Sequence, residues 1–283
     1  MSLFLPSLRK PSVIPGFGLT LGLTLSWLGL LVLLPLAALI LKAANLGLMG
    51  FLASVTTPRV LAALRLSFGL SLLAAAINTV FGLLIAWVLV RYDFPFRRFV
   101  EALVDIPFAL PTAVAGIALT AIYAPNGIIG SLLAPMGIKI AFTPLGILIA
   151  LIFIGIPFVV RAVEPVLADL DADVEEAAHC LGATALQTFQ RVILPTAFPA
   201  LTTGFALAFA RAVGEYGSVI FIAGNLPMVS EIAPLLIVVK LEEFEYEQAT
   251  AIAVVMLFVS LLILFGINSM QAWSRWRFLR AEA

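Results

Sequence analysis

Six long apolar stretches, separated by short polar segments, dominate this sequence. They cover residues 17–41, 66–90, 106–122, 144–160, 196–222 and 249–272. A helix needs about 20 apolar residues to cross the hydrocarbon core of a bilayer, and open sheets are excluded there because their backbone groups would lack hydrogen-bond partners. The pattern therefore predicts an all-α integral membrane protein with six transmembrane helices.

Composition agrees with this prediction, and the charges orient the spans. Hydrophobic residues make up 63% of the chain and charged residues 11%, with a mean hydropathy of +1.15. This leaves too little polar surface to cover a soluble globule. If the N-terminus faces the cytoplasm, ten Lys and Arg residues near the span ends lie inside and five lie outside. Because cytoplasmic loops retain positive charge, we expect both termini in the cytoplasm.

A polar interruption, residues 173–195, separates the fourth stretch from the fifth. It predicts two short helices that meet at Gly182, since glycine readily adopts the positive φ that such a corner needs. Thr184 and Gln187 have the spacing of a capping box, which would open the second helix. Pro195 cannot continue that helix without kinking it. An ordinary amphipathic connector is the alternative interpretation of this segment.

The order of residues in this interruption resembles the EAA loop of type I importers of the ATP-binding-cassette (ABC) class. The matching positions are Glu176, Ala177, Ala178, Gly182, Val192, Leu194 and Pro195, with valine where the family usually has isoleucine. The resemblance implies a MetI-like permease fold in which this loop docks into an ATPase subunit. On that basis Glu176, Ala177, Ala178, Gly182, Leu194 and Pro195 are expected to couple ATP hydrolysis to transport.

Three further stretches, residues 91–95, 105–116 and 211–225, are similar to the sulfate/thiosulfate permeases of the CysT (also called CysU) type. The resemblance implies a subunit of a bacterial inner-membrane importer that moves the anion by alternating access. It also implies three partners: a CysW-like second permease, a CysA-like ATPase homodimer and an external sulfate-binding protein. Molybdate and tungstate permeases share much of the pattern, so these oxyanions are the alternative substrates.

Three regions follow from this interpretation. Residues 1–60 are expected to form an N-terminal anchor helix and an outer loop, and the anchor is retained because 25 apolar residues are too many for a typical cleaved signal. Residues 61–270 are expected to form the type I transmembrane domain, with the coupling loop at 173–195. Residues 271–283 are expected to be a cytoplasmic tail.

Arg211 and Glu215 lie within the fifth stretch, where a charge costs roughly 2.5 to 3.5 kcal/mol at mid-membrane. They are four residues apart, so they can pair on one face of a helix. Either Arg211 lies near the route of the dianion, with Glu215 limiting its affinity, or the two form a structural pair that fixes packing at a subunit interface.

Pro107 and Pro111 lie within the third stretch, where they remove backbone donors and bend the helix. A broken helix could line a polar path, to which Thr112 would add a hydroxyl. The alternative is a packing kink in which Thr112 bonds to its own backbone.

Other charged and small residues receive simpler interpretations. Asp105 is expected to be a solvated end residue or a partner of Arg97 or Arg98, and the acidic run at 242–247 a solvated outer loop. A stripe of small residues in the fifth stretch would let another helix approach closely, either from a second subunit or from the same chain. Its members are Gly204, Ala208, Ala212 and Gly214.

Enzymatic chemistry is not expected in this chain. No stretch matches the phosphate-binding pattern Gly-x4-Gly-Lys-Ser/Thr, and the single histidine and single cysteine are the adjacent His179 and Cys180. We therefore expect no metal site and no cofactor here, with ATP and Mg bound by the partner ATPase. A gradient-driven carrier should show several intramembrane coupling residues, and a purely structural scaffold would tolerate Glu176→Lys.

Overall fold

The computed structural model describes residues 16–281, and throughout this range the regular structure is helical. The α-helices are α1 (Phe17–Leu28), α2 (Leu34–Ala44), α3 (Gly47–Val55), α4 (Pro58–Arg91), α5 (Arg97–Ala109), α6 (Thr112–Tyr123), α7 (Ile128–Leu133), α8 (Pro144–Ala168), α9 (Ala172–Cys180), α10 (Ala185–Thr188), α11 (Leu194–Val213), α12 (Val219–Ile222), α13 (Ala233–Glu242) and α14 (Tyr246–Ala281). Two π-helical segments, η1 (Gly29–Leu33) and η3 (Phe189–Ile193), and a 3₁₀ turn, η2 (Ala134–Met136), complete the order.

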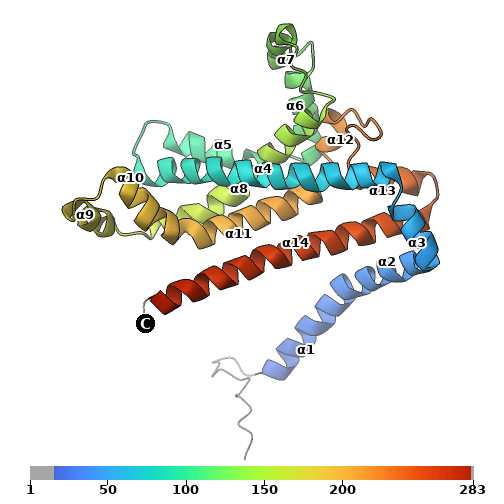
Figure 1. The fold of residues 1–283 in the computed structure, drawn as a ribbon, viewed down its shortest axis with the longest axis horizontal. Coiled ribbons are helices and arrows are strands. Elements are labelled where there is room, and N and C mark those ends of the chain that lie inside the picture. Colours follow the sequence, from blue (N-terminus) through green and yellow to red (C-terminus); the bar gives the residue numbers. More distant parts are fainter. Residues whose placement is uncertain (1–15, 282–283) are drawn as a thin grey trace, which may run out of the picture.

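Six helical segments of this described range are long and apolar enough to cross a membrane. They are Phe17–Ala44, Pro58–Arg91, Thr112–Met136, Pro144–Ala168, Ala185–Val213 and Tyr246–Ser269. The prediction of an all-α protein with six membrane spans is therefore confirmed. The loop formed by α9 and α10 lies at one end of the bundle, and α3 and α13 lie at the other (Figure 1).

The centre of the molecule is built from α4, α8 and α11, which pack against one another along their lengths (Figure 1). Close packing, rather than burial of apolar surface, holds helices together in lipid. A Cβ added at Gly82 of α4 would lie 2.7 Å from Val159 Cγ1, and one added at Gly204 of α11 would lie 2.9 Å from Val159 Cα. Gly204, Ala208 and Ala212 are all buried within the chain, so these three members of the small-residue stripe serve an intramolecular contact.

The periphery is formed by α1, α2 and α14. The last helix packs on α2, α3 and α13, whereas α1 has no buried residue, as expected for a helix whose apolar surface faces lipid. The region expected to be an outer loop after the anchor contains α3. Helix α14 continues to Ala281, so the expected tail is helical as far as that residue, and residues 1–15 and 282–283 lie outside the described range.

The third and fifth spans differ from their predicted bounds. At the third, α5 ends at Ala109, Leu110 and Pro111 are extended, and α6 begins at Thr112. Pro111 accounts for this break because a proline forces the preceding residue away from the helical region, whereas Pro107 lies inside α5. At the fifth, the span begins at Ala185 and ends at Val213, so the predicted continuation to residue 222 as one helix is wrong.

Two prolines follow the π-helical segments. Pro35 lies two residues after η1 ends and Pro195 two residues after η3 ends. A π-helical turn is one of the ways in which a helix accommodates a proline, which lacks the backbone N–H that would donate within the helix. The kink expected at Pro195 thus takes the form of a π-turn, and α10, η3 and α11 form one 29-residue helical segment.

Candidate functional site

The candidate coupling loop is the turn from α9 into α10, and its local geometry follows from its sequence. Gly182 has φ +84. Its N–H donates to the His179 carbonyl (2.9 Å) and the Ala183 N–H donates to the Ala178 carbonyl (3.0 Å), the two bonds of a Schellman helix end. The Thr184 hydroxyl accepts from the Gln187 N–H (3.3 Å), and the Gln187 side chain accepts from the Thr184 N–H (2.9 Å). The predicted glycine corner and capping box are both confirmed.

One face of this loop is open to the surroundings. Val174, Ala177 and Leu181 are exposed and lie three and four residues apart, so they share a stripe along α9. Leu181 is 89% exposed and Leu186, on α10, is 64% exposed. Glu176 is exposed as well. These apolar side chains are therefore accessible for contact with another protein.

The opposite face of the loop is held by the last turn of α4. Arg91 Nη2 lies 2.6 Å from Glu175 Oε1 and donates to the Leu170 carbonyl at 3.2 Å. The guanidinium also lies over the ring of Trp87, 5.6 Å from its centroid. Trp87 in turn meets Phe189 of η3 edge to face, with ring centroids 6.0 Å apart. The sequence alone does not predict this cluster, because nothing in a linear pattern distinguishes Glu175 from Glu176.

Glu215 forms the second polar centre, at the end of α11. Its side chain is 2% exposed and pairs with Arg211, whose side chain is 32% exposed. Glu215 Oε1 accepts from the Ser218 N–H at 2.8 Å and from the Ser218 hydroxyl at 2.9 Å. The predicted pair exists, but not on a continuous helical turn, because α11 ends at Val213 and Gly214 is its C-cap. The carboxylate therefore also satisfies donors of the segment that follows the helix.

Helix α6 begins directly against this segment. A Cβ added at Gly217 would lie 2.2 Å from Thr112 Oγ1, and one added at Gly116 would lie 2.4 Å from the Ser218 carbonyl oxygen. The fold thus brings Thr112 and the Arg211–Glu215 pair into one region. Pro111 is exposed at the start of α6, and Pro107 lies in α5.

A groove of about 490 Å³ runs between α5, α8 and α11, and Phe108, Phe158 and Leu207 are among the residues that line it. Arg161 of α8 borders the groove and pairs with both Asp105 of α5 and Glu164. The expected pairing of Asp105 with Arg97 or Arg98 is wrong. Because α5 packs against α8, Asp105 reaches a cation 56 residues away in sequence.

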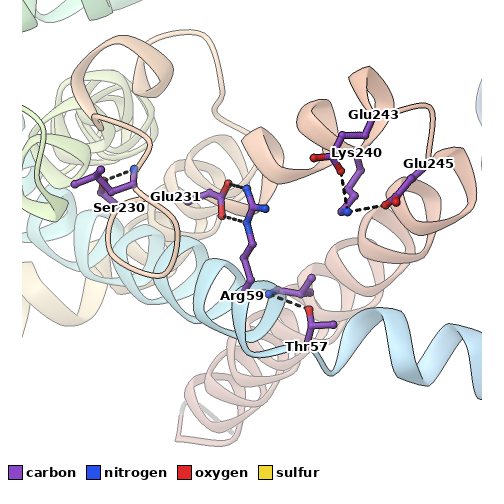
Figure 2. A network of polar contacts seen from close by, with 9 residues as sticks. Thr57, Arg59, Ser230, Glu231, Lys240, Glu243 and Glu245 are labelled. Carbon is purple, nitrogen blue, oxygen red and sulfur yellow. Dashed lines mark hydrogen bonds and ion pairs between the residues drawn. The ribbon is translucent and has the colours of Figure 1, made fainter.

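Two ion clusters lie at the end of the bundle opposite the coupling loop (Figure 2). Arg59 donates to both carboxylate oxygens of Glu231 (2.8 and 2.7 Å), and Glu231 is 3% exposed. Lys240 Nζ lies 2.6 Å from Glu245 and 2.9 Å from Glu243. Hydrogen bonds to Glu245 and then Glu243 raise the pKa of Lys240, and the same ammonium lowers the pKa of Glu243. The acidic run is therefore partly paired, not simply solvated as predicted.

Comparison with known proteins agrees with this geometry. Residues 78–279 match the family described as the inner membrane component of binding-protein-dependent transport systems. The sulfate transport system permease protein CysT of Salmonella typhimurium is 49% identical over 92% of this chain and 94% of its own length. The protein of the same name from Synechococcus elongatus is 50% identical over 95% of this chain and 98% of its own length. The resemblance to CysT-type permeases is thus confirmed.

Solved structures support the fold. A bacterial ABC transporter involved in the import of the acidic polysaccharide alginate matches with a TM-score of 0.74 at 17% identity, covering 89% of this chain and 93% of that one. The MetNI methionine ABC transporter matches with a TM-score of 0.55 at 19% identity, covering 75% of this chain and 94% of that one. The fold is that of a type I ABC importer permease, and this chain belongs to the family of binding-protein-dependent transport system inner membrane components.

Proposed function

We propose that this chain is the membrane-spanning permease subunit of an ATP-driven sulfate/thiosulfate importer of the bacterial inner membrane, with both termini in the cytoplasm. The observation that carries the proposal is the identity of 49 to 50% with sulfate permeases over nearly the whole chain. As a permease, the chain moves the anion and leaves ATP hydrolysis to a partner. ATP and Mg bind to that ATPase, and this chain needs no cofactor of its own.

The coupling loop supports an ATPase partner. Glu176 and the stripe of Val174, Ala177 and Leu181 are accessible, which suits a surface that receives a CysA-like ATPase homodimer. Gly182 and the capping box hold the loop in a defined shape, so that a force applied to α9 reaches α10 and, through Leu194 and Pro195, α11.

Arg211 supports a second permease subunit. A charged side chain at membrane depth faces protein or water and not lipid, yet the Arg211 side chain is 32% exposed in the isolated chain. The face it occupies, next to Thr112 and Glu215, therefore suits a pore shared with a CysW-like permease. Pairing with Glu215 leaves Arg211 a weak and reversible attractant for a dianion that an external binding protein delivers.

The proposal is tested by reconstituting this chain in proteoliposomes with a CysW-like permease, a CysA-like ATPase and the binding protein. We expect ATP-dependent uptake of radiolabelled sulfate that excess thiosulfate inhibits and excess molybdate does not. Glu176→Lys should abolish co-purification of the ATPase, whereas Asp173→Lys, a change of equal charge on the same helix, should not. Uptake that follows an ion gradient without ATP, or a preference for molybdate, would contradict the proposal.

A further inference from the structure

We infer that α4 is the element that transmits motion of the coupling loop to the opposite side of the membrane, with Arg91 and Arg59 as the positioning residues at its two ends. The inference rests on the proposed function and goes beyond it, since it concerns how the force crosses the membrane.

The inner end of α4 is attached to the coupling loop at two points and to the residues that lead into it at a third. Arg91 pairs with Glu175 of α9 and bonds to the Leu170 carbonyl, and Trp87 packs on Phe189 of η3. These contacts fall on both sides of the loop, before and after the corner at Gly182. Glu175 and Arg91 side chains are 24% and 19% exposed, so this ion pair is less screened than a pair at the surface. A displacement of α9 is therefore passed to the last turn of α4.

The outer end of α4 is attached to the segment that leads into α13. Arg59, in the first turn of α4, holds the buried Glu231 through two hydrogen bonds. About two turns further on, the Ser67 hydroxyl accepts from the Ala233 N–H at 2.8 Å, and both groups are buried. A bidentate arginine–carboxylate pair fixes orientation as well as distance. The segment 223–232 and the start of α13 must therefore follow α4 (Figure 2).

Between these ends α4 is a single rigid rod. It is continuous for 34 residues, with its proline confined to the first position. Arg91 lies 32 residues after Arg59, which corresponds to about 48 Å along the helix at 1.5 Å per residue. Ala63, Ala74 and Ala86 are almost completely buried along this length, and tightly packed helix surfaces do not deform continuously. A shift at one end is therefore delivered at the other.

This arrangement assigns different tasks to two neighbouring glutamates. Glu176 is exposed and available to the ATPase, whereas Glu175 attaches the loop to α4. Without the Glu175–Arg91 pair, the ATPase would still bind the loop and hydrolyse ATP, but the loop would move without carrying α4. Loss of Arg91 should thus uncouple hydrolysis from transport, an effect that loss of docking would not produce.

The test compares sulfate transported with ATP hydrolysed in the reconstituted complete importer. For Arg91→Gln and for Glu175→Gln we expect unchanged co-purification of the ATPase and a fall in sulfate per ATP of about fivefold or more, the usual scale of coupling between sites. Arg98→Gln, an exposed arginine in the next helix, is the matched control and should leave the ratio unchanged. Combining Arg91→Glu with Glu175→Arg should restore part of the ratio.

A second readout separates transmission from simple stability. An environment-sensitive fluorophore is placed at Asp173 or at Met228, both exposed, in a Cys180→Ser background. In Arg91→Gln the ATP-induced signal should persist at Asp173 and be lost at Met228, and in Glu231→Gln it should also be lost at Met228. An unchanged sulfate-to-ATP ratio in both Arg91→Gln and Glu175→Gln would overturn the inference, as would loss of ATPase binding. If Arg91→Gln fails to fold, the isosteric Glu175→Gln decides alone. Absence of sulfate uptake by the unmodified complex would instead overturn the proposed function.

Discussion

Asn78 of α4 occupies the space that a side chain at Gly155 of α8 would need. A Cβ added at Gly155 would lie 2.2 Å from Asn78 Nδ2, and Asn78 itself is 1% exposed. The contact between the two central helices therefore depends on a polar side chain in one and a glycine in the other. The closely packed neighbours of Asn78 also restrict its side chain to few conformations.

Gly155→Ala should weaken the α4–α8 contact. Since the new methyl group must displace Asn78, we expect a loss of stability of about 1 to 3 kcal/mol, the usual cost of overpacking, seen as a lower midpoint of thermal unfolding in detergent. Gly69→Ala in α4 is the control, because no atom lies within 4 Å of its Cβ position. That change should be neutral or stabilising by up to about 1 kcal/mol. Equal behaviour of the two variants would contradict the packing argument.

Glu215→Ala should destabilise the chain far more than Ser218→Ala. The first change leaves Arg211 without its carboxylate and removes the acceptor of the buried Ser218 N–H. Breaking a buried pair costs about 3 to 5 kcal/mol, and the partial exposure of Arg211 places the expected loss near the lower value. Removing only the Ser218 hydroxyl should cost about 1 kcal/mol. Thermal unfolding of the two variants measures the difference, and similar losses would show that Glu215 does not organise this segment.

Gly182→Ala should loosen the coupling loop without introducing a clash. The residue has φ +84 and no atom within 4 Å of its Cβ position, so the cost is purely conformational, about 1 to 2 kcal/mol for a left-handed residue with a side chain. Hydrogen exchange of the α9 amides should accelerate by roughly 5 to 30 fold. Gly182→Asn should have a smaller effect, because asparagine tolerates this conformation better. Equal protection in all three proteins would argue against the glycine requirement.

The Lys240 cluster should respond to pH in a direction set by its charges. Lys240 lowers the pKa of Glu243, so the folded value lies below the unfolded one. The stabilisation is therefore present above the ordinary glutamate pKa of about 4.3 and is lost as the pH falls through the folded value. Lys240→Gln should raise the pKa of Glu243 in an NMR titration of labelled glutamate carboxyls. Lys139→Gln, in the loop before α8, should leave it unchanged.

The six membrane spans and the local geometry of the coupling loop were open to prediction from the sequence. Runs of about 20 apolar residues predict spans because lipid offers no alternative to helices. Gly182, Thr184 and Gln187 predict the loop because a positive φ and a capping box involve only residues within a few positions of one another. Glu215 and Arg211 were identified as a pair for the same reason, since they are four residues apart.

The tertiary structure alone decided which charges and which helix ends meet. Asp105 pairs with Arg161, Arg59 with Glu231 and Arg91 with Glu175, each across a gap in sequence that no local pattern bridges. The end of α11 at Gly214 was likewise not predicted, because the fifth stretch was interpreted as one span as far as residue 222, whereas the break at Pro111 was expected from the proline itself. Hydropathy indicates whether a segment partitions into lipid or into water. The path of the backbone and the pairing of charges depend instead on how α4, α8 and α11 pack.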